Sequence, residues 1–277
     1  MSLMLKLLST TLVLSSVIYA SATGDKVAEF LSDEFSDNPR LESVDVKVTD
    51  EVPLKDLKGW TGYILEVHAT LKSNPPKPIT QKMVWFSNGT MITKELTNMD
   101  SGENMVNAVK PDFKKEFYKK ENLIYGNENA RHKVAVFSDP LCPFCRGFVP
   151  GAIKEMKQNP DKYALYYYHL PLDRIHPASV YVVRAAVAAE HKGVKDVILK
   201  MYNIKVNPRE KDINKILAAF NKATGAHITK KDIESKAVLD QVNFDQKVAR
   251  DLLVGGTPTM YLDNKIDNTK KKYKKVR

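Results

Sequence analysis

The stretch from Val134 to Cys145, which reads VAVFSDPLCPFC, decides the fold of this chain. It opens with four apolar residues, which predict a short buried strand. It closes with a C-x-x-C motif, whose Pro143 suits the first position of a helix because proline has a fixed φ and no N–H group. The sequence therefore predicts a strand, a short connection and a helix that begins at Cys142.

Cys142 and Cys145 are the only cysteines among the 277 residues, so a disulfide-rich framework is excluded. A thiol at a helix N-terminus lies near unpaired backbone N–H groups, which stabilise its thiolate form. We expect Cys142 to be that thiol and to be exposed. Cys145, one turn further along, can then resolve a mixed disulfide by attacking Cys142. A C-x-x-C motif between a strand and a helix thus predicts a thiol–disulfide redox site.

Other interpretations of the cysteine pair are weaker. A structural disulfide over so short a loop constrains little of the unfolded chain. A zinc site needs about four ligands, and the histidines are scattered along the chain without an H-x₃₋₅-H pair. We therefore expect neither a metal nor another cofactor. Phe144 adds no charge between the cysteines, so the thiolate depends mainly on the helix N-terminus, and the ring can provide an apolar contact for unfolded substrates.

The rest of the same domain is predicted downstream of the motif. Residues 163–170 and 260–262 are strand candidates, and helical patterns fill most of the sequence between them. The sequence GGTPT at 255–259 lies just before the last strand and is a candidate second half of the site. Its Thr257 backbone can pair with an extended substrate peptide. The alternative interpretation is an ordinary Gly-Pro turn.

The sequence before residue 100 has a different pattern. Apolar side chains in 26–35 have helical spacing, and alternating apolar residues then predict antiparallel strands, with a type I′ hairpin turn at Asn88-Gly89. One helix and a small meander have few ways to protect the sheet edges, and pairing with a second copy would protect them. The polar, lysine-rich residues that follow, 103–130, indicate a linker with helical content.

The first 22 residues have the pattern of a secretory signal peptide. A single charge at Lys6 precedes a brief apolar core, and Ala20-Ser21-Ala22 forms a small-x-small cleavage site. The alternative is a membrane anchor, but the apolar run is shorter than the roughly 20 residues that span a bilayer. We therefore expect cleavage after Ala22 and export to a compartment where thiols can be oxidised.

The chain has a formal charge of +10, which invites a nucleic-acid hypothesis. Seven Lys and Arg residues and one Asp lie in 265–277, so much of the excess belongs to the C-terminus. We expect 266–277 to be a basic tail that is solvated and frayed. The rest of the chain is nearly balanced in charge, and no nucleic-acid partner is expected.

The CPFC motif, Asp139 three residues before it, and Gly256-Thr257-Pro258 together resemble the DsbC/DsbG branch of periplasmic thiol:disulfide interchange proteins, in the thioredoxin superfamily. The resemblance implies an α+β, cystatin-like dimerisation domain over 23–100 and a partly helical linker over 101–130. It also implies an α/β thioredoxin-fold catalytic domain over 131–265, with a helical insertion at about 172–250.

The resemblance also assigns roles to the residues of the site. The nucleophile is Cys142 and the resolving thiol is Cys145. By the same resemblance, Pro143 and Phe144 modulate the active site, and the cis-proline loop of Thr257 and Pro258 binds substrate.

These observations predict a periplasmic thiol–disulfide oxidoreductase that isomerises or reduces non-native disulfides in exported proteins. Pro258 lies 116 positions after Cys142, a spacing closer to that of the DsbA branch, so a DsbA-like dithiol oxidase is an alternative. A dimeric chaperone with secondary redox activity is another. The expected partners are unfolded or misoxidised exported proteins with cysteines, a second copy of the chain in a homodimer, and a membrane redox partner. That membrane partner would be of the DsbD type for an isomerase and of the DsbB type for an oxidase.

Overall fold

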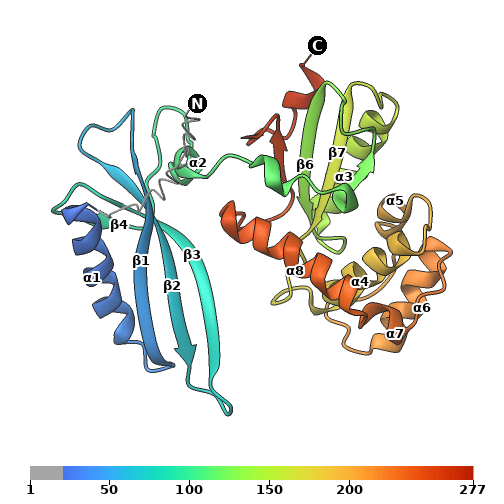
Figure 1. The fold of residues 1–277 in the computed structure, drawn as a ribbon, viewed down its shortest axis with the longest axis horizontal. Coiled ribbons are helices and arrows are strands. Elements are labelled where there is room, and N and C mark those ends of the chain that lie inside the picture. Colours follow the sequence, from blue (N-terminus) through green and yellow to red (C-terminus); the bar gives the residue numbers. More distant parts are fainter. Residues whose placement is uncertain (1–20, 277) are drawn as a thin grey trace, which may run out of the picture. The chain divides into compact units, whose positions relative to one another are not determined.

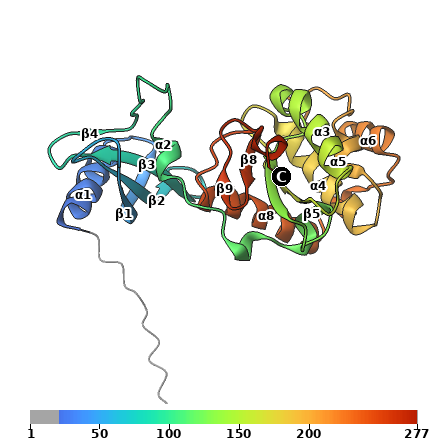
Figure 2. The same ribbon diagram turned by 90° about the horizontal axis from the view of Figure 1, so that it is seen from above.

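The computed structural model describes residues 21–276, which form two compact units with a boundary between Glu95 and Leu96. Figures 1 and 2 show that each unit has its own sheet and its own helices. The predicted signal peptide falls almost wholly on residues 1–20, which lie outside the described residues. No helix in the described part of the chain is long and apolar enough to cross a membrane.

The first unit consists of helix α1 (Ala22–Ser36) packed on a four-stranded antiparallel sheet. The strands lie side by side in chain order: β1 (Leu41–Pro53), β2 (Thr61–Leu71), β3 (Lys77–Ser87) and β4 (Ile92–Thr93). Ser21 caps α1, because its hydroxyl accepts a hydrogen bond from Gly24 N. Val27 and Leu31 are buried on the face of α1 that packs against β1 and β2.

The predicted hairpin between β3 and β4 is present, but its turn is not of type I′. Gly89 has a φ of +88°, whereas Asn88 does not have a positive φ, and a type I′ turn needs a positive φ at both positions. The side-chain carbonyl of Asn88 instead accepts hydrogen bonds from Thr90 N at 3.0 Å and Met91 N at 2.8 Å. Asn88 therefore closes the turn with its side chain rather than with a left-handed backbone.

The second unit contains a five-stranded sheet in the order β5-β7-β6-β8-β9. Its strands are β5 (Leu123–Tyr125), β6 (His132–Ser138), β7 (Tyr163–His169), β8 (Thr259–Leu262) and β9 (Lys265–Ile266). Strands β6 and β7 are parallel and are joined by helix α3 (Pro143–Lys157), whereas the other neighbouring pairs are antiparallel. The strand and the helix predicted on either side of the CPFC motif are thus β6 and α3.

The helices between β7 and β8 form most of the rest of this unit. They are α4 (Pro177–His191), α5 (Val197–Met201), α6 (Ile213–Thr224), α7 (Lys230–Ile233) and α8 (Lys236–Asp251). Helix α4 contacts each of the other four, which explains why it is apolar on more than one face. These helices occupy most of the stretch predicted as a helical insertion.

The central strands direct alternate side chains into two different cores. Val136 and Tyr167 belong to the core that is completed by α3, α4 and α5. Phe137 and Tyr168, their neighbours in the sequence, belong to the core that is completed by α8. The alternation follows from the two-residue period of a strand, and it places the CPFC helix and α8 on opposite faces of the sheet.

The whole of the predicted linker, 101–130, is part of the second unit. Helix α2 (Val106–Val109) and the 3₁₀ helices η1 (Lys115–Phe117) and η2 (Lys120–Asn122) lead into β5, which pairs with β7. Phe113 and Phe117 are buried in the core beside α8, whereas the lysines around them are exposed. The linker prediction therefore fails here. It followed the many lysines in the sequence, whereas the two buried phenylalanines pack this stretch against the core of the second unit.

The prediction of a solvated, frayed C-terminal tail is wrong for residues 266–276. Tyr273, in the 3₁₀ helix η3 (Lys272–Lys274), is 2% exposed, and its hydroxyl donates to Glu155 Oε2 at 2.8 Å. The hydroxyl of Tyr163 donates to the carbonyl of Tyr273 at 2.6 Å, and Lys274 forms an ion pair with Glu155 at 2.7 Å. One buried tyrosine and one carboxylate on α3 thus hold this basic segment against the unit.

Candidate active site

Cys142 lies where β6 leads into helix α3. It is the N-cap residue of α3, and Pro143 occupies the first turn, so the predicted helix start is confirmed. The Cys142 N–H donates to the carbonyl of Asp139 at 3.2 Å, and this turn directs the chain from the strand into the helix. Cys145 follows in the first turn of α3.

The Cys142 thiol is less accessible than the sequence predicted. Both cysteines are free thiols, but Cys142 is only 4% exposed. Its sulfur donates to the carbonyl of Thr257 at 3.7 Å, so the loop before β8 lies against it. Phe144 is the exposed side chain of the motif, with 77% of its surface accessible. The expectation of an exposed Cys142 is therefore wrong.

The loop at 255–259 meets both cysteines through Thr257. The peptide bond between Thr257 and Pro258 is cis. The carbonyl of Thr257 faces Cys142, and its side-chain hydroxyl belongs to the polar surroundings that lower the pKa of Cys145. This hydroxyl is buried and forms no hydrogen bond with another described residue. The structure therefore brings together the two sequence segments that were predicted to form the site.

Cys145 is the deeper of the two thiols and has no solvent exposure. Burial raises the pKa of Cys145 to about 11, because a thiolate loses its hydration when it is buried. The hydroxyls of Ser138 and Thr257 and the backbone of Asp139 oppose this rise in the pKa, whereas the neighbouring Cys142 adds to it. Cys145 is therefore a protonated thiol near neutral pH and must lose its proton before it can act as a nucleophile.

Asp139 is a fully buried carboxylate that fixes the chain just before Cys142. Its Oδ1 accepts hydrogen bonds from Leu141 N at 2.7 Å and from Ser179 Oγ at 2.6 Å. Its Oδ2 accepts one from Leu172 N at 2.8 Å and lies 3.0 Å from His176 Nδ1. Asp139 thus ties the turn before Cys142 to the loop after β7 and to the start of α4.

Arg146 holds the same turn from the other side. Its guanidinium donates to the carbonyl of Pro140 at 2.8 Å and to the carbonyl of Ile204 at 2.9 Å. Burial lowers the pKa of Arg146, while the nearby carboxylate of Asp139 opposes the change. Arg146 and Asp139 therefore connect the CPFC turn to the helices that lie between β7 and β8.

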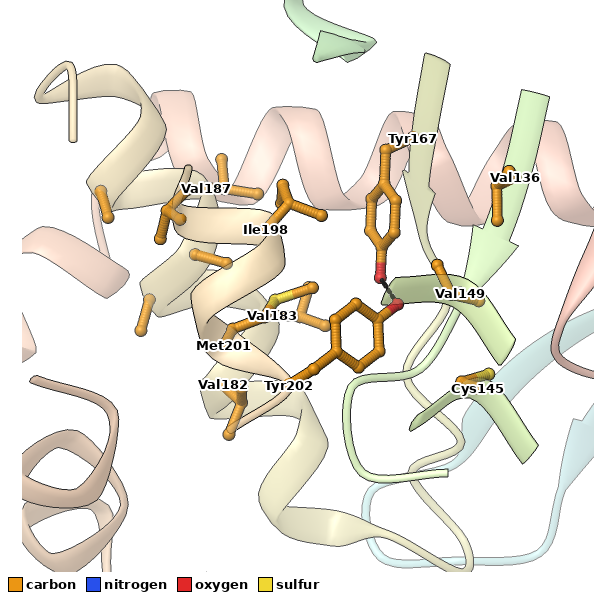
Figure 3. Close-up of a cluster of buried hydrophobic side chains, with 14 of the residues drawn as sticks. Val136, Cys145, Val149, Tyr167, Val182, Val183, Val187, Ile198, Met201 and Tyr202 are labelled. Atoms are coloured by element: carbon orange, nitrogen blue, oxygen red, sulfur yellow. Dashed lines mark hydrogen bonds between the residues drawn. The ribbon is translucent and has the colours of Figure 1, made fainter. Parts of the chain in front are cut away.

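A chain of buried hydroxyl groups lies next to Cys145. The hydroxyl of Tyr202 is 2.7 Å from Ser138 Oγ and 2.7 Å from the hydroxyl of Tyr167. Figure 3 shows the hydroxyls of Tyr167 and Tyr202 pointing toward each other, with Cys145 on the adjacent helix. The two tyrosines come from β7 and from the end of α5.

Sequence reasoning missed most of these supporting residues. It singled out Asp139 only for its distance from the motif, and it treated Tyr167 only as part of a strand. A usable signal was present, because a tyrosine in a fully buried strand needs a hydrogen-bond partner for its hydroxyl. The sequence does not indicate which distant residue supplies that partner, and here it is Tyr202.

The candidate site consists of thiols, hydroxyls and one buried carboxylate. Across residues 21–276, no three or more His, Cys, Asp or Glu side chains are grouped so that they could hold a metal ion. Two thiols one helical turn apart can exchange with a third sulfur and then form a disulfide with each other.

The comparison with protein families matches residues 119–277 to the thioredoxin family. The chain belongs to this family. The matched range begins within the stretch predicted as a linker and includes the CPFC helix, the helices between β7 and β8, and the loop of Thr257. This range agrees with the packing of Phe117 and β5 onto the sheet of the second unit. No curated protein sequence matches the chain.

Several solved structures of thioredoxin-like proteins are similar to part of the chain. BdbD from Bacillus subtilis, in its oxidised form, is 17% identical, with 60% of this chain and 95% of that chain covered and a TM-score of 0.47. A thioredoxin-like oxidoreductase from Silicibacter pomeroyi is 19% identical, with 56% and 88% covered and a TM-score of 0.44. The catalytic domain of Proteus mirabilis ScsC is 21% identical, with 52% and 77% covered and a TM-score of 0.42.

Proposed function

We propose that this thioredoxin-family protein is a thiol–disulfide oxidoreductase. The observation that carries the proposal is the arrangement of the two thiols. Cys142 lies at the N-terminus of α3 against the Thr257 carbonyl, and Cys145 lies fully buried one turn behind it. Cys142 is the outer thiol of the pair and begins the helix, whereas Cys145 has no solvent exposure, so Cys142 is the nucleophile.

The reaction has two exchange steps. The Cys142 thiolate attacks a substrate disulfide, which forms a bond from Cys142 to one substrate sulfur and releases the other with the electron pair. Cys145 then loses its proton and attacks Cys142, which releases the second substrate sulfur. The two cysteines are oxidised to a disulfide, and the substrate disulfide is reduced to two thiols. When a freed substrate thiol attacks the mixed disulfide before Cys145 does, the substrate is isomerised.

Within this activity we favour isomerisation or reduction of non-native disulfides in exported proteins. Phe144, between the cysteines, is apolar and exposed, which suits contact with unfolded chains. Cys142 is only 4% exposed, so an extended, flexible segment reaches its sulfur more easily than a folded surface does. The resemblance to the DsbC/DsbG branch supports the same choice. It also supports a periplasmic location, a cystatin-like dimerisation domain and recycling by a DsbD-type membrane reductase.

The test is the recovery of activity in a scrambled multi-disulfide protein that is incubated with the purified, reduced chain. We expect recovery with the wild type and none with Cys142→Ala. If the protein instead oxidises a reduced substrate rapidly and leaves the scrambled substrate unchanged, the isomerase proposal is wrong. Sedimentation of the full chain tests the homodimer separately, and a monomer at assay concentration would refute it.

A DsbA-like oxidase is a second candidate, because the helices α4 to α8 lie between β7 and β8 and supply a helical region of the kind expected for that branch. An oxidase would be recycled by a DsbB-type quinone reductase partner. The two candidates differ in the resting state of the cysteines in the cell. Acid trapping followed by thiol alkylation should find a reduced pair for an isomerase and a disulfide for an oxidase.

A further inference from the structure

The hydroxyl chain beside Cys145 has no role in the two exchange steps as they stand. The Ser138 hydroxyl belongs to the polar surroundings that lower the pKa of Cys145, and Ser138, Tyr202 and Tyr167 are linked by two contacts of 2.7 Å. Ser138 is fully buried, and Tyr167 and Tyr202 are 1% and 6% exposed. The chain therefore leads from the resolving thiol into the protein interior rather than to solvent.

The partners of these hydroxyls distinguish them from other buried tyrosines. Tyr168, next to Tyr167 in β7, donates its hydroxyl to the backbone carbonyl of Phe117 at 2.7 Å, on the other face of the sheet. A carbonyl only accepts, so the direction of that bond is fixed. Ser138, Tyr202 and Tyr167 bond to one another instead, and a hydroxyl can both donate and accept. The direction of hydrogen bonding along this chain can therefore reverse.

The resolving step is the step that needs such a reversal. Cys145 begins as a thiol and becomes a thiolate before its sulfur attacks Cys142. The new bond between Cys142 and Cys145 forms as the bond between Cys142 and the substrate sulfur breaks. The electron pair leaves with the substrate sulfur, which takes up the proton that Cys145 has lost. A thiolate in a fully buried position is unfavourable unless hydrogen-bond donors surround it.

We propose that Ser138 is a catalytic residue of the resolving step, which donates a hydrogen bond to the Cys145 thiolate, and that Tyr202 and Tyr167 are positioning residues that orient the Ser138 hydroxyl. In the thiol state Ser138 can accept from Cys145 and donate toward Tyr202. In the thiolate state the order reverses, so that Tyr167 donates to Tyr202, Tyr202 to Ser138, and Ser138 to the sulfur. The proposal rests on the proposed thiol–disulfide exchange.

The proposal also gives the helical region between β7 and β8 a part in the chemistry. Tyr202 is the C-cap residue of α5, so this region supplies the middle hydroxyl of the chain. The other titratable groups that face the chain are Cys142, Asp139, His169 and Arg146, the last of which interacts with Tyr202. Cys142 interacts with Cys145, and Asp139 interacts with Tyr202. The ring centroids of His169 and Tyr167 are 4.9 Å apart.

The test follows the reaction of the reduced full-length protein with 4,4′-dithiodipyridine in a stopped-flow instrument. Each exchange step releases one absorbing thiopyridone, so attack by Cys142 and resolution by Cys145 appear as two phases. Cys145→Ala should show only the first phase. Ser138→Ala should slow the second phase by roughly tenfold at neutral pH, the order expected for a lost hydrogen bond to a charged group. Tyr202→Phe should slow it by about threefold, because it acts through Ser138.

The pH profile separates catalysis from a merely structural effect. In Ser138→Ala and Tyr202→Phe, the pH at which the second phase reaches half its maximal rate should move upward, while the first phase keeps its wild-type rate. Tyr168→Phe is the matched control, since it removes a buried tyrosine hydroxyl from the same strand, and it should leave both phases unchanged.

Two results would overturn these proposals, and they are distinguishable. If the wild type releases no thiopyridone through Cys142, the proposed thiol–disulfide exchange fails. If the wild type shows both phases, but folded Ser138→Ala or folded Tyr202→Phe resolves at the wild-type rate and with the wild-type pH midpoint, only the role of the hydroxyl chain fails. Tyr202→Phe keeps the ring in the core, so the test remains available even if Ser138→Ala does not fold.

Discussion

Replacement of Asp139 by asparagine tests how the turn before Cys142 is held. In the wild type, each carboxylate oxygen faces one backbone N–H and one side chain: Leu141 and Ser179 on Oδ1, Leu172 and His176 on Oδ2. An asparagine keeps only one oxygen. Whichever way its amide is turned, its NH₂ group faces a backbone N–H that cannot rotate away.

The expected loss follows from these contacts. A hydrogen bond to a charged group contributes about 1.5–3 kcal/mol, and a buried N–H without an acceptor costs about 1–3 kcal/mol. Ser179 and His176 can reorient, so at least one backbone hydrogen bond is lost outright. Asp139→Asn should therefore lower the free energy of unfolding of the second unit by about 3 kcal/mol.

Urea unfolding can report the two units separately. Both tryptophans, Trp60 and Trp85, lie in the first unit, so tryptophan fluorescence follows that unit and serves as an internal control. Far-UV circular dichroism mainly follows the helices α3 to α8 of the second unit. We expect the midpoint from circular dichroism to fall while the fluorescence midpoint stays in place.

The control variant is Asp240→Asn, which removes an exposed carboxylate that pairs with Lys236 on the surface of α8. It should change the unfolding free energy by no more than about 0.5 kcal/mol. If Asp139→Asn costs less than about 1 kcal/mol at an unchanged denaturant slope, the carboxylate does not hold the turn and the reasoning is refuted.

Three further predictions concern other parts of the chain. Burial raises the pKa of Asp245 to about 7, above its unfolded value near 3.9. The protonated form of Asp245 therefore stabilises the fold fully below about pH 4, and this stabilisation is lost as the pH rises through about 7. Asp245→Asn should remove that loss, which is on the order of 4 kcal/mol, and so flatten the dependence of the urea midpoint on pH between about 5 and 8. An unchanged slope would contradict the prediction. Gly126 has a φ of +78°, and a Cβ there would lie 1.9 Å from the carbonyl oxygen of Tyr163, so Gly126→Ala should cost more than about 3 kcal/mol in thermal unfolding. Gly225→Ala, at a φ of +73° with open space around it, should cost only about 1–2 kcal/mol. Equal losses of stability in the two variants would show that the contact with the Tyr163 carbonyl is removed by a small shift of the backbone. Phe144→Ser should leave stability within about 0.5 kcal/mol but slow the reduction of an unfolded protein disulfide more than that of dithiodipyridine, and equal slowing would argue against a substrate contact.

Local patterns were sufficient for the central part of the fold. The apolar run from Val134 and the proline after Cys142 act within a few residues, and the structure has the strand and the helix where they predict them. The strand at Tyr163–His169 and the helical character of the sequence between it and the last strand also follow from local apolar patterns. In these segments the residues that determine the structure are the residues of the segment itself.

The predictions that failed depend on contacts with distant residues. The basic C-terminal segment is docked because Tyr273 meets Tyr163 and Glu155, and the lysine-rich stretch before β5 is docked because Phe113 and Phe117 enter a core. In both cases exposed lysines outnumber the buried aromatic side chains. A prediction from composition is dominated by the lysines, whereas the free energy of docking comes mainly from the few buried aromatic rings.

The candidate site divides in the same way. The motif and the GGTPT loop identify the thiols and Thr257, but the residues that set the environment of Cys145 come from separate segments: Ser138 from β6, Tyr167 from β7 and Tyr202 from α5. The carboxylate of Asp139 and the guanidinium of Arg146 also reach into the region between β7 and β8. Because that region contacts the turn before Cys142 and the hydroxyl beside Cys145, a change in its helices alters the chemistry of both thiols without any change in the CPFC motif. We therefore expect substitutions in these helices, as well as in the two residues between the cysteines, to shift the proposed activity between oxidation and isomerisation.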